Sequence, residues 1–286
     1  MTLTIGLIDY LNTMPFHYDL AERLDSDAVR FERGVPSQMN RMLLSGEIDL
    51  APISAIEAAR NAEQFVILPG LSIASLGAVR TVLLFSWAAD MSDLDGQSIA
   101  LTDHSATSVA LLKVLCRERY HIEPRFTVTR QHLPSMLAEH RGALVIGDDA
   151  LVEGTLHRAL SSPDGWALPH IFDLGDEWLK MTGLPFTFAV WAARKERVHE
   201  LADAGVFDAL YASTERGLLE DSRDGLAQTY AARLGLPAGV CRRYLRDLRY
   251  HLTDDDLAGL KRYLELALED FDWHRLEFWE TREAVL

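Results

Sequence analysis

Residues 10–16 read YLNTMPF and directly follow the apolar run LTIGLI at residues 3–8. The apolar run predicts a short buried strand, and the residues after the segment predict a helix. Asn12 and Thr13 therefore lie at a strand-to-helix turn, with Pro15 near the first helical turn, where its missing N–H costs nothing. Such a turn directs backbone N–H groups and short polar side chains out of the carboxyl edge of a sheet. The segment predicts an α/β domain that binds a small anion at this edge.

Length and charge limit the classes of protein to which the chain can belong. Its 286 residues are enough for two domains, and 48% hydrophobic and 25% charged residues are ordinary for a globular enzyme or binding protein. The net charge of −15 argues against a nucleic acid or an anionic membrane as partner. An anionic ligand would be repelled by the field of the whole protein, so local hydrogen-bond donors must compensate.

The two cysteines, Cys116 and Cys241, have no zinc-type spacing. A disulfide between them is left open, and two buried reduced thiols are the favoured interpretation. The N-terminus starts as a strand without a basic or long apolar leader, and no run reaches the ~18 apolar residues of a membrane span. We therefore expect a cytoplasmic protein.

The order of strands and helices predicts two lobes, the second inserted in the first. Strands and helices alternate, stop at the polar junction at residues 90–96, and alternate again. Everything after Arg194 reads as helical. We expect lobe 1 at residues 1–88 plus 191–286 and lobe 2 at residues 89–190, with the ligand between them, as in a hinge-closing binder of small molecules.

Several standard catalytic motifs are absent from the sequence. It has no Gly-rich dinucleotide turn, no phosphate-binding Gly-Lys-Ser/Thr loop, no His-Glu-x-x-His and no Gly-x-Ser-x-Gly. The ten histidines are scattered. We therefore expect neither a metal site nor a nucleotide cofactor.

Small polar clusters recur at the predicted strand ends. Beyond Asn12 and Thr13, they are found at residues 52–54, 79–81 and 102–108. The last cluster decorates a helix N-terminus, whose free N–H groups favour a carboxylate or phosphate, although simple N-capping explains it equally well. Four such clusters in two lobes favour a binding cleft. Their candidate ligand-binding side chains are Asn12, Thr13, Ser54, Thr81, Ser105, Thr107 and Ser108.

Several segments together resemble a known enzyme family. They cover residues 5–194 in order, and the chain is similar through them to the chorismate dehydratases of the futalosine route to menaquinone. The wider family includes 1,4-dihydroxy-6-naphthoate synthase. The segments are residues 10–16, 48–54, 68–73, 105–109, 146–151, 173–175 and 182–192, together with Trp178.

The resemblance implies a fold and a reaction. The fold would be a two-lobed, periplasmic-binding-protein-like (type 2) α/β fold with mixed, largely parallel sheets and an interlobe cleft. The reaction would be the cofactor-independent dehydration of chorismate, a dianion, to 3-[(1-carboxyvinyl)oxy]benzoate, or 3-enolpyruvylbenzoate. Loss of the ring hydroxyl and of the neighbouring ring proton makes the ring aromatic, so no strong base is demanded. Donors on the ring carboxylate would stabilise the developing charge.

The same resemblance assigns roles to residues. Asn12 would align the substrate at the reacting centre, although it would also suit a turn. Thr81, at a position that is usually serine in the family, would hold a carboxylate or the leaving hydroxyl, although it would also suit a strand. Arg80 is expected at the surface. The expected substrate-binding residues are Thr13, Ser54, Ser105, Thr107, Ser108, Gly147, Asp148, Leu184, Pro185 and Phe186.

No side chain stands out as the base. Asp148 and Asp149 offer carboxylates, but they equally suit a helix N-terminus. We therefore expect the enolpyruvyl carboxylate of the substrate itself to remove the ring proton, while the site fixes the geometry.

Two alternatives of different classes remain open at this point. One is the naphthoate synthase of the same pathway, against which residues 182–186, TGLPF, argue. The other is a non-catalytic small-anion binding protein, against which the missing export signal argues. A homodimer is also left open.

Overall fold

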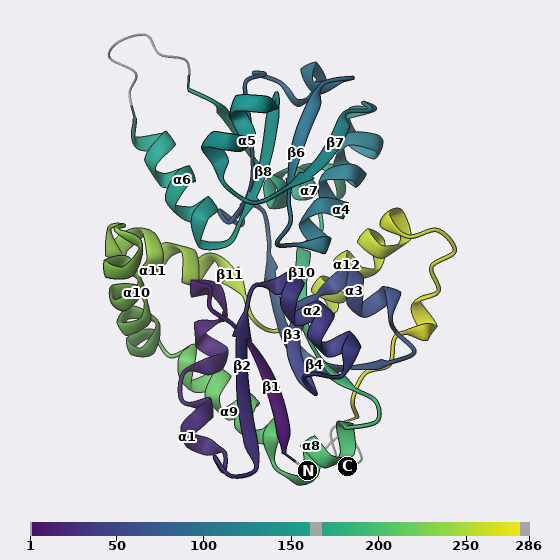
Figure 1. The fold of residues 1–286 in the computed structure, drawn as a ribbon, viewed down its shortest axis with the longest axis vertical. Helices are drawn as coiled ribbons and strands as arrows, with labels where there is room; N and C mark the ends of the chain where they lie inside the picture. The colour runs from purple at the N-terminus through teal and green to yellow at the C-terminus, as the bar shows by residue number, and fades with distance from the viewer. Residues whose placement is uncertain (1, 161–167, 281–286) are drawn as a thin grey trace.

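The computed structural model describes residues 2–160 and 168–280. Two sheets form the centres of two lobes, which are stacked along the long axis of the molecule (Figure 1). The strands of the first sheet are β1 (Leu3–Ile8), β2 (Val29–Gly34), β3 (Leu50–Ser54), β4 (Phe65–Ser75), β10 (Phe186–Arg194) and β11 (Leu248–Arg249). Those of the second are β5 (Val82–Ser86), β6 (Ser98–Thr102), β7 (Arg125–Thr129), β8 (Gly142–Ile146) and β9 (His170–Asp173).

Both sheets mix parallel and antiparallel pairs. The strand orders are β11-β4-β10-β3-β1-β2 and β7-β6-β8-β5-β9. In the first sheet β1 pairs in parallel with β2 and β3, and in the second β6 pairs in parallel with β7 and β8. Antiparallel pairing is more extensive than the alternation of strands and helices predicted. It arises at β10 and β5, the strands next to the two crossings between the lobes.

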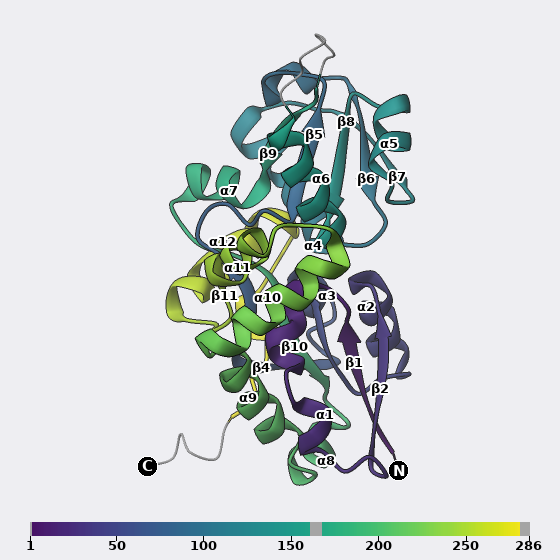
Figure 2. The same cartoon turned by 90° about the vertical axis from the view of Figure 1, so that its left-hand side faces the viewer.

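Helices cover the sheets of both lobes (Figures 1 and 2). Strands β3, β5 and β8 are buried along their whole length, as expected for strands covered on both faces. The helices around the first sheet are η1 (Leu11–His17), α1 (Leu20–Arg23), α2 (Pro36–Ser45), α3 (Ala55–Arg60), α8 (Val198–Asp203), α9 (Val206–Gly217), α10 (Glu220–Leu234), α11 (Ala238–Asp247), α12 (Asp254–Ala267) and η4 (Trp273–Arg275). Those around the second are η2 (Met91–Leu94), α4 (Ala106–Val114), η3 (Leu115–Tyr120), α5 (Leu133–Glu139), α6 (Gly147–Ala159) and α7 (Leu174–Thr182).

The limits of the lobes differ from the predicted ones. The prediction placed β5 in lobe 1, but β5 pairs with β8 and β9 in the second sheet. It also placed residues 186–190 in lobe 2, but all of β10 belongs to the first sheet. The chain therefore crosses at residues 76–81 and again at residues 183–185, between α7 and β10. Both crossings are short and contain apolar residues such as Leu76, Val79 and Leu184, so composition gives no signal there.

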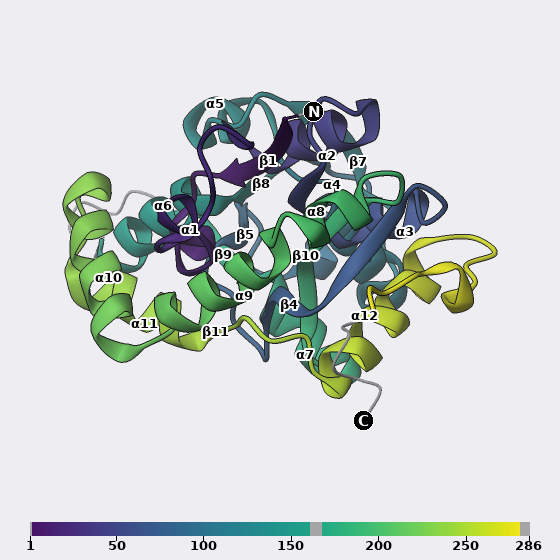
Figure 3. The ribbon, with the colours of Figure 1, turned by 90° about the horizontal axis from the view of Figure 1, so that it is seen from below.

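Two local predictions were also wrong. Pro15 does not open an α-helix but lies inside the 3₁₀ helix η1, and the α-helix that follows is only the four residues of α1. The chain after Arg194 is not helical throughout, because β11 adds to the edge of the first sheet beside β4. Seen from below (Figure 3), α10 and α11 lie on one side of the molecule and α12 on the other.

The first crossing is held by one carboxylate. Asp173 accepts hydrogen bonds from the backbone N–H groups of Val79 at 2.9 Å and Arg80 at 2.7 Å, and it also caps α7 through Gly175. Arg80 adopts a left-handed φ of 66°, and its side chain pairs at the surface with Asp247, as expected from the sequence. Burial raises the pKa of Asp173, and the four N–H groups it binds oppose that rise.

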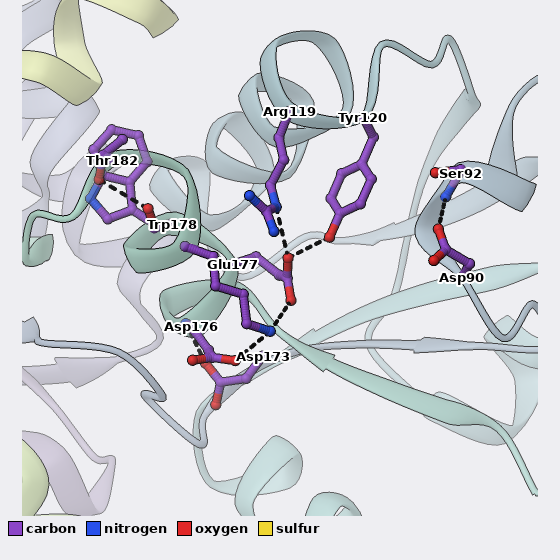
Figure 4. A network of polar contacts seen from close by, with 10 residues as sticks. Asp90, Ser92, Arg119, Tyr120, Asp173, Asp176, Glu177, Trp178 and Thr182 are labelled. Atoms are coloured by element: carbon purple, nitrogen blue, oxygen red, sulfur yellow. Dashed lines mark hydrogen bonds and ion pairs between the residues drawn. The ribbon is translucent and has the colours of Figure 1, made fainter.

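A second network fixes α7 itself (Figure 4). Glu177, which is buried, accepts hydrogen bonds from Arg119 at 3.0 Å and from Tyr120, both in η3. Lys180 donates to the other oxygen of the same carboxylate at 2.8 Å. The helix that begins at Asp173 is thus anchored to the second sheet's own helices.

Cys116 and Cys241 are free and buried, which confirms the prediction of two reduced thiols. None of the described helices combines the length and apolar character of a membrane-spanning segment. Among the described residues, no group of His, Cys, Asp and Glu side chains is arranged to hold a metal ion.

Candidate active site

A pocket with about 550 Å³ of space, including its open mouth, lies between the two lobes. Pockets that bind small molecules are mostly apolar with a few polar groups. Its apolar lining is Ile8, Pro36, Ile53, Ile73, Val79, Val82, Ile146, Phe188 and Ala189. Its polar lining, together with a glycine, is Tyr10, Asn12, Thr13, Ser54, Thr81, Ser105, Ser108 and Gly147.

Seven of the predicted site residues line this pocket. The structure thus brings together residues from all four polar clusters of the sequence, at the ends of strands in both lobes. They are Asn12, Thr13, Ser54, Thr81, Ser105, Ser108 and Gly147.

Asn12 presents an unused acceptor. Its Oδ1 atom is buried and has no hydrogen-bond partner among the residues that the structure describes. Its side chain does form a hydrogen bond with Tyr244, a residue of α11. A buried polar atom without a partner costs free energy, so an Oδ1 atom facing a pocket is suited to a ligand that carries a donor.

Thr81 lies at the start of β5 and is also bound to Tyr244. The two hydroxyl oxygens are 2.9 Å apart, and both side chains are buried. The Thr81 carbonyl accepts a hydrogen bond of 2.9 Å from the backbone N–H of Gly147. The two predicted catalytic residues, Asn12 and Thr81, are therefore joined through one phenol.

Thr13 and Ser54 are fixed by their neighbours. The Thr13 hydroxyl donates to backbone oxygens of Ile8 and Tyr10, which closes the turn at the end of β1. Ser54 directly precedes α3, but its side chain makes no capping bond. Instead its hydroxyl oxygen accepts from Asn40 Nδ2 at 3.1 Å, and its N–H donates to Asn40 Oδ1 at 3.0 Å. Because the hydroxyl accepts, its own proton is available to a ligand.

Residues 105–108 separate into two roles. Ser105 is the N-cap of α4, as the alternative interpretation predicted, and accepts from the Ser108 N–H at 3.2 Å. Thr107 does not line the pocket. Its hydroxyl oxygen accepts from the backbone N–H of Ile56 in lobe 1 at 3.2 Å, so it joins the lobes instead of facing a ligand.

Gly147 and Asp148 also face lobe 1. Gly147 has φ of 71°, and a Cβ atom there would lie 2.7 Å from the ring of Tyr10. Asp148 does not line the pocket, and its Oδ1 accepts from the Leu11 N–H at 3.0 Å. Burial raises the pKa of Asp148 to about 6, while the Leu11 N–H and Arg233 oppose the rise.

Leu184, Pro185 and Phe186 are not part of the pocket lining. The Pro185 carbonyl accepts from Trp178 Nε1 at 3.0 Å. Phe186 packs edge-on against Phe188, with ring centroids 4.6 Å apart, and Phe188 does line the pocket. Phe186 therefore lies one layer behind the wall and supports it.

Further bonds across the cleft hold the lobes together. The Tyr10 hydroxyl lies 3.3 Å from His104 Nδ1, and the Ser37 N–H donates to the His104 carbonyl at 3.0 Å. With the bonds of Asp148 and Thr107, they join η1, α2 and α3 of lobe 1 to the helices of lobe 2. These bonds keep the two lobes in direct contact around the pocket.

The pocket is electrically neutral on its surface. None of the described residues that line it is Lys, Arg or His. The donors that this lining offers to an anion are hydroxyl groups and the backbone N–H groups at the N-terminus of the nine-residue helix α4.

Sequence reasoning missed three residues of the site. Tyr10 belongs to the quoted segment but was read as part of the turn. Asn40 lies in an ordinary amphipathic helix, and Tyr244 lies in the C-terminal helices, which carry no motif. Only the contacts of the folded chain identify the last two, because their partners are distant in sequence.

The family model described as "Menaquinone biosynthesis" matches residues 3–269. A relative from Thermus thermophilus, a chorismate dehydratase, is 36% identical over 91% of this chain and 93% of its own length. The chain belongs to the menaquinone biosynthesis family. A second member of this family, the chorismate dehydratase of Campylobacter jejuni, is 26% identical over 92% of this chain and 96% of its own length.

Solved structures confirm the fold predicted for this family member. A structure from Archaeoglobus fulgidus aligns with a TM-score of 0.66 at 17% identity over 93% of this chain and 96% of that one. The periplasmic aliphatic sulphonate binding protein of Escherichia coli aligns with the same TM-score and identity, over 98% of this chain and 92% of that one. The chain has the two-lobed α/β fold of periplasmic binding proteins.

Proposed function

We propose that this protein is a chorismate dehydratase that eliminates water from chorismate to give 3-enolpyruvylbenzoate. The observation that carries the proposal is the unpaired Asn12 Oδ1 atom in a neutral, mostly apolar interlobe pocket. Chorismate at neutral pH has two carboxylates, an ether oxygen and one ring hydroxyl, which is its only hydrogen-bond donor. Asn12 Oδ1 is an acceptor, so it pairs with this hydroxyl, the group that leaves.

Different residues of the pocket lining contact different parts of the substrate. Phe188 and the aliphatic side chains enclose the ring and exclude water. The hydroxyl groups of Ser54 and Ser108 and the N-terminus of α4 hold the carboxylates, while the Ser105 hydroxyl donates to Ser108 Oγ at 3.0 Å. Donors on the ring carboxylate stabilise the negative charge that spreads onto it through the diene when the ring proton leaves.

The elimination balances without any cofactor or second substrate. The enolpyruvyl carboxylate takes the proton from the ring carbon that carries the ether. The electron pair of that C–H bond enters the ring, and the neighbouring C–O bond breaks with its electrons on oxygen. The leaving oxygen takes a proton and departs as water, and the ring becomes aromatic. The reaction is therefore a cofactor-independent hydro-lyase reaction, with Asn12 and Thr81 at the leaving oxygen.

Asp148 and Asp149 are not the base in this scheme. Asp148 accepts the Leu11 N–H, and Asp149 accepts from Gln131 Nε2 at 2.8 Å. Neither residue lines the pocket, and the ring proton would have to reach them through the wall.

The test is to incubate the purified protein with chorismate. We expect the absorbance of the cyclohexadiene to fall while an aromatic product lighter by one water appears in the mass spectrum. The Asn12→Ala variant should lose turnover by at least about 100-fold, in the range of other lost transition-state contacts. No turnover of chorismate by the wild-type protein, with tight binding of another small anion, would contradict the proposal and favour a binding protein.

A parallel incubation distinguishes chorismate dehydratase from the naphthoate synthase of the same pathway. The naphthoate synthase of the same pathway acts on a nucleoside-derived substrate, so turnover of that substrate and not of chorismate would assign the chain to it.

A further inference from the structure

Tyr244 lies beneath the pocket and contacts both residues placed at the leaving oxygen. It belongs to α11 in the C-terminal helices, is 1% exposed and does not line the pocket. Its hydroxyl oxygen is 2.9 Å from Thr81 Oγ1 and forms a second hydrogen bond with the Asn12 side chain. No other side chain of the described residues is bound to both.

The direction of each bond follows from counting donors and acceptors. A carboxamide accepts only through its oxygen and donates only through its NH₂, so the bond between Asn12 and the Tyr244 phenol is donated by the Asn12 NH₂. Asn12 Oδ1 has no partner, which excludes the opposite orientation. The single proton of the phenol needs an acceptor, and Thr81 Oγ1 is the one it contacts.

The bonds therefore run in one direction, from Asn12 Nδ2 to Tyr244 and from Tyr244 to Thr81. This order leaves Asn12 Oδ1 pointing to the pocket as an acceptor. It also leaves the Thr81 proton without a strong partner, since the Val79 carbonyl is 3.4 Å away. An acceptor and a donor side by side match one ligand hydroxyl, which gives its proton to Oδ1 and receives one from Thr81.

We propose that Tyr244 is a positioning residue that orients the Asn12 amide and the Thr81 hydroxyl toward the leaving hydroxyl of the substrate. The role in catalysis depends on the proposed function, whereas the orientation of the amide does not. Tyr244 supplies no proton to the reaction, because burial raises its pKa well above the ordinary value and keeps the phenol neutral.

The matched pair of variants is Tyr244→Phe and Tyr250→Phe. Both remove one hydroxyl from a buried ring, but within the described part of the chain the Tyr250 hydroxyl has no hydrogen-bond partner. Tyr244→Phe should lower kcat for chorismate at least tenfold while KM changes less than threefold and the shape of the pH profile stays the same. Tyr250→Phe should match the wild-type protein in all three.

Binding of the product gives a second kinetic control. The product 3-enolpyruvylbenzoate keeps both carboxylates but has lost the hydroxyl. Its Kd should therefore be the same for Tyr244→Phe and the wild-type protein, whereas general damage to the pocket would weaken it. A Tyr244→Phe enzyme with wild-type kcat, or with product affinity lost in parallel with kcat, would overturn the proposal while leaving the proposed function standing.

A spectroscopic readout tests the orientation without turnover. The chain contains three asparagines, Asn12, Asn40 and Asn61, so labelling asparagine with ¹⁵N gives three side-chain NH₂ pairs. We expect Tyr244→Phe to shift the Asn12 pair, assigned by its loss in Asn12→Asp, and to leave the other two in place. Tyr250→Phe should shift none. An unmoved Asn12 pair in Tyr244→Phe would overturn the proposal even if the wild-type protein does not act on chorismate.

Discussion

The Asp148 carboxylate in lobe 2 accepts a 3.0 Å hydrogen bond from the backbone N–H of Leu11 in lobe 1. Leu11 directly precedes Asn12, so this bond fixes the turn that carries the unpaired acceptor. It also places an acidic group at the contact between the lobes, where burial raises the pKa of Asp148 to about 6.

The first prediction concerns the pH dependence of stability. The unfolded-state pKa of Asp is near 3.9, so the folded state binds the proton of Asp148 more tightly. The stability from this group is present below about pH 4 and is lost as the pH rises through about 6, by up to about 3 kcal/mol. Asp148→Asn keeps an acceptor for Leu11 and avoids that loss. Urea denaturation at pH 4.5 and at pH 8 should show the variant gaining relative to the wild-type protein at the higher pH. Parallel pH curves for both proteins would contradict the assignment.

The second prediction concerns the base. Asp148→Asn and Asp149→Asn should each keep turnover of chorismate within about tenfold of the wild-type rate, because the substrate's own carboxylate takes the proton. Steady-state kinetics and product binding measure this directly. Loss of turnover with product affinity intact in either variant would make that aspartate the base.

The third prediction separates the two functions of Thr81. Thr81→Ser keeps the hydroxyl and should retain kcat within about fivefold. Thr81→Val is nearly isosteric but removes the acceptor of the buried Tyr244 phenol, which costs about 1–3 kcal/mol of stability. It should also lower kcat at least about 100-fold. Equal kcat values for the two variants would show that the Thr81 hydroxyl takes no part in the reaction.

The fourth prediction uses two glycines with the same backbone conformation. Gly147 and Gly235 have φ of 71° and 67°, but only at Gly147 would a Cβ atom meet a neighbour, the ring of Tyr10 at 2.7 Å. Both alanine variants carry the cost of a left-handed residue, about 1–2 kcal/mol. Gly147→Ala should in addition displace Tyr10 and raise KM for chorismate at least about tenfold, because the lobes no longer close on the ligand. A KM for Gly147→Ala equal to that of Gly235→Ala would show that the contact with Tyr10 is dispensable.

The fifth prediction follows from the charge of the molecule. The protein carries a net charge of −15, and the described lining of its pocket has no cationic side chain for a dianion. Raising the ionic strength from about 0.01 M to 0.15 M shortens the Debye length from about 30 Å to 8 Å and screens the repulsion. KM for chorismate should therefore fall with added salt while kcat stays constant. A rise in KM would reveal a cation that contacts the substrate.

The local patterns in the sequence predicted the strands and the turns that follow them. Apolar runs such as residues 3–8 are buried on both faces in the fold, and short polar residues after them reach the pocket, as Asn12, Ser54 and Ser105 show. These features depend on neighbours in the chain, and their signals are therefore local.

Contacts between distant segments explain what the sequence did not predict. Thr107 looks like a capping residue but bonds to Ile56 across the cleft, and Phe186 looks like a pocket residue but lies behind Phe188. The crossing at residues 76–81 is fixed by the Asp173 carboxylate, which comes from a distant part of the chain and accepts the N–H groups of Val79 and Arg80. Tyr244 is separated from Asn12 and Thr81 by most of the chain, so no spacing could connect them.

The position of Tyr244 in the chain also bears on how the protein is made. A ribosome that has synthesised the protein as far as Arg194 has completed every strand of both sheets except β11. The nascent chain then has Asn12 and Thr81, but not the phenol that joins them. A message truncated before α11 would therefore yield a product that has the strands carrying both pocket residues but lacks the phenol to which we assign their orientation.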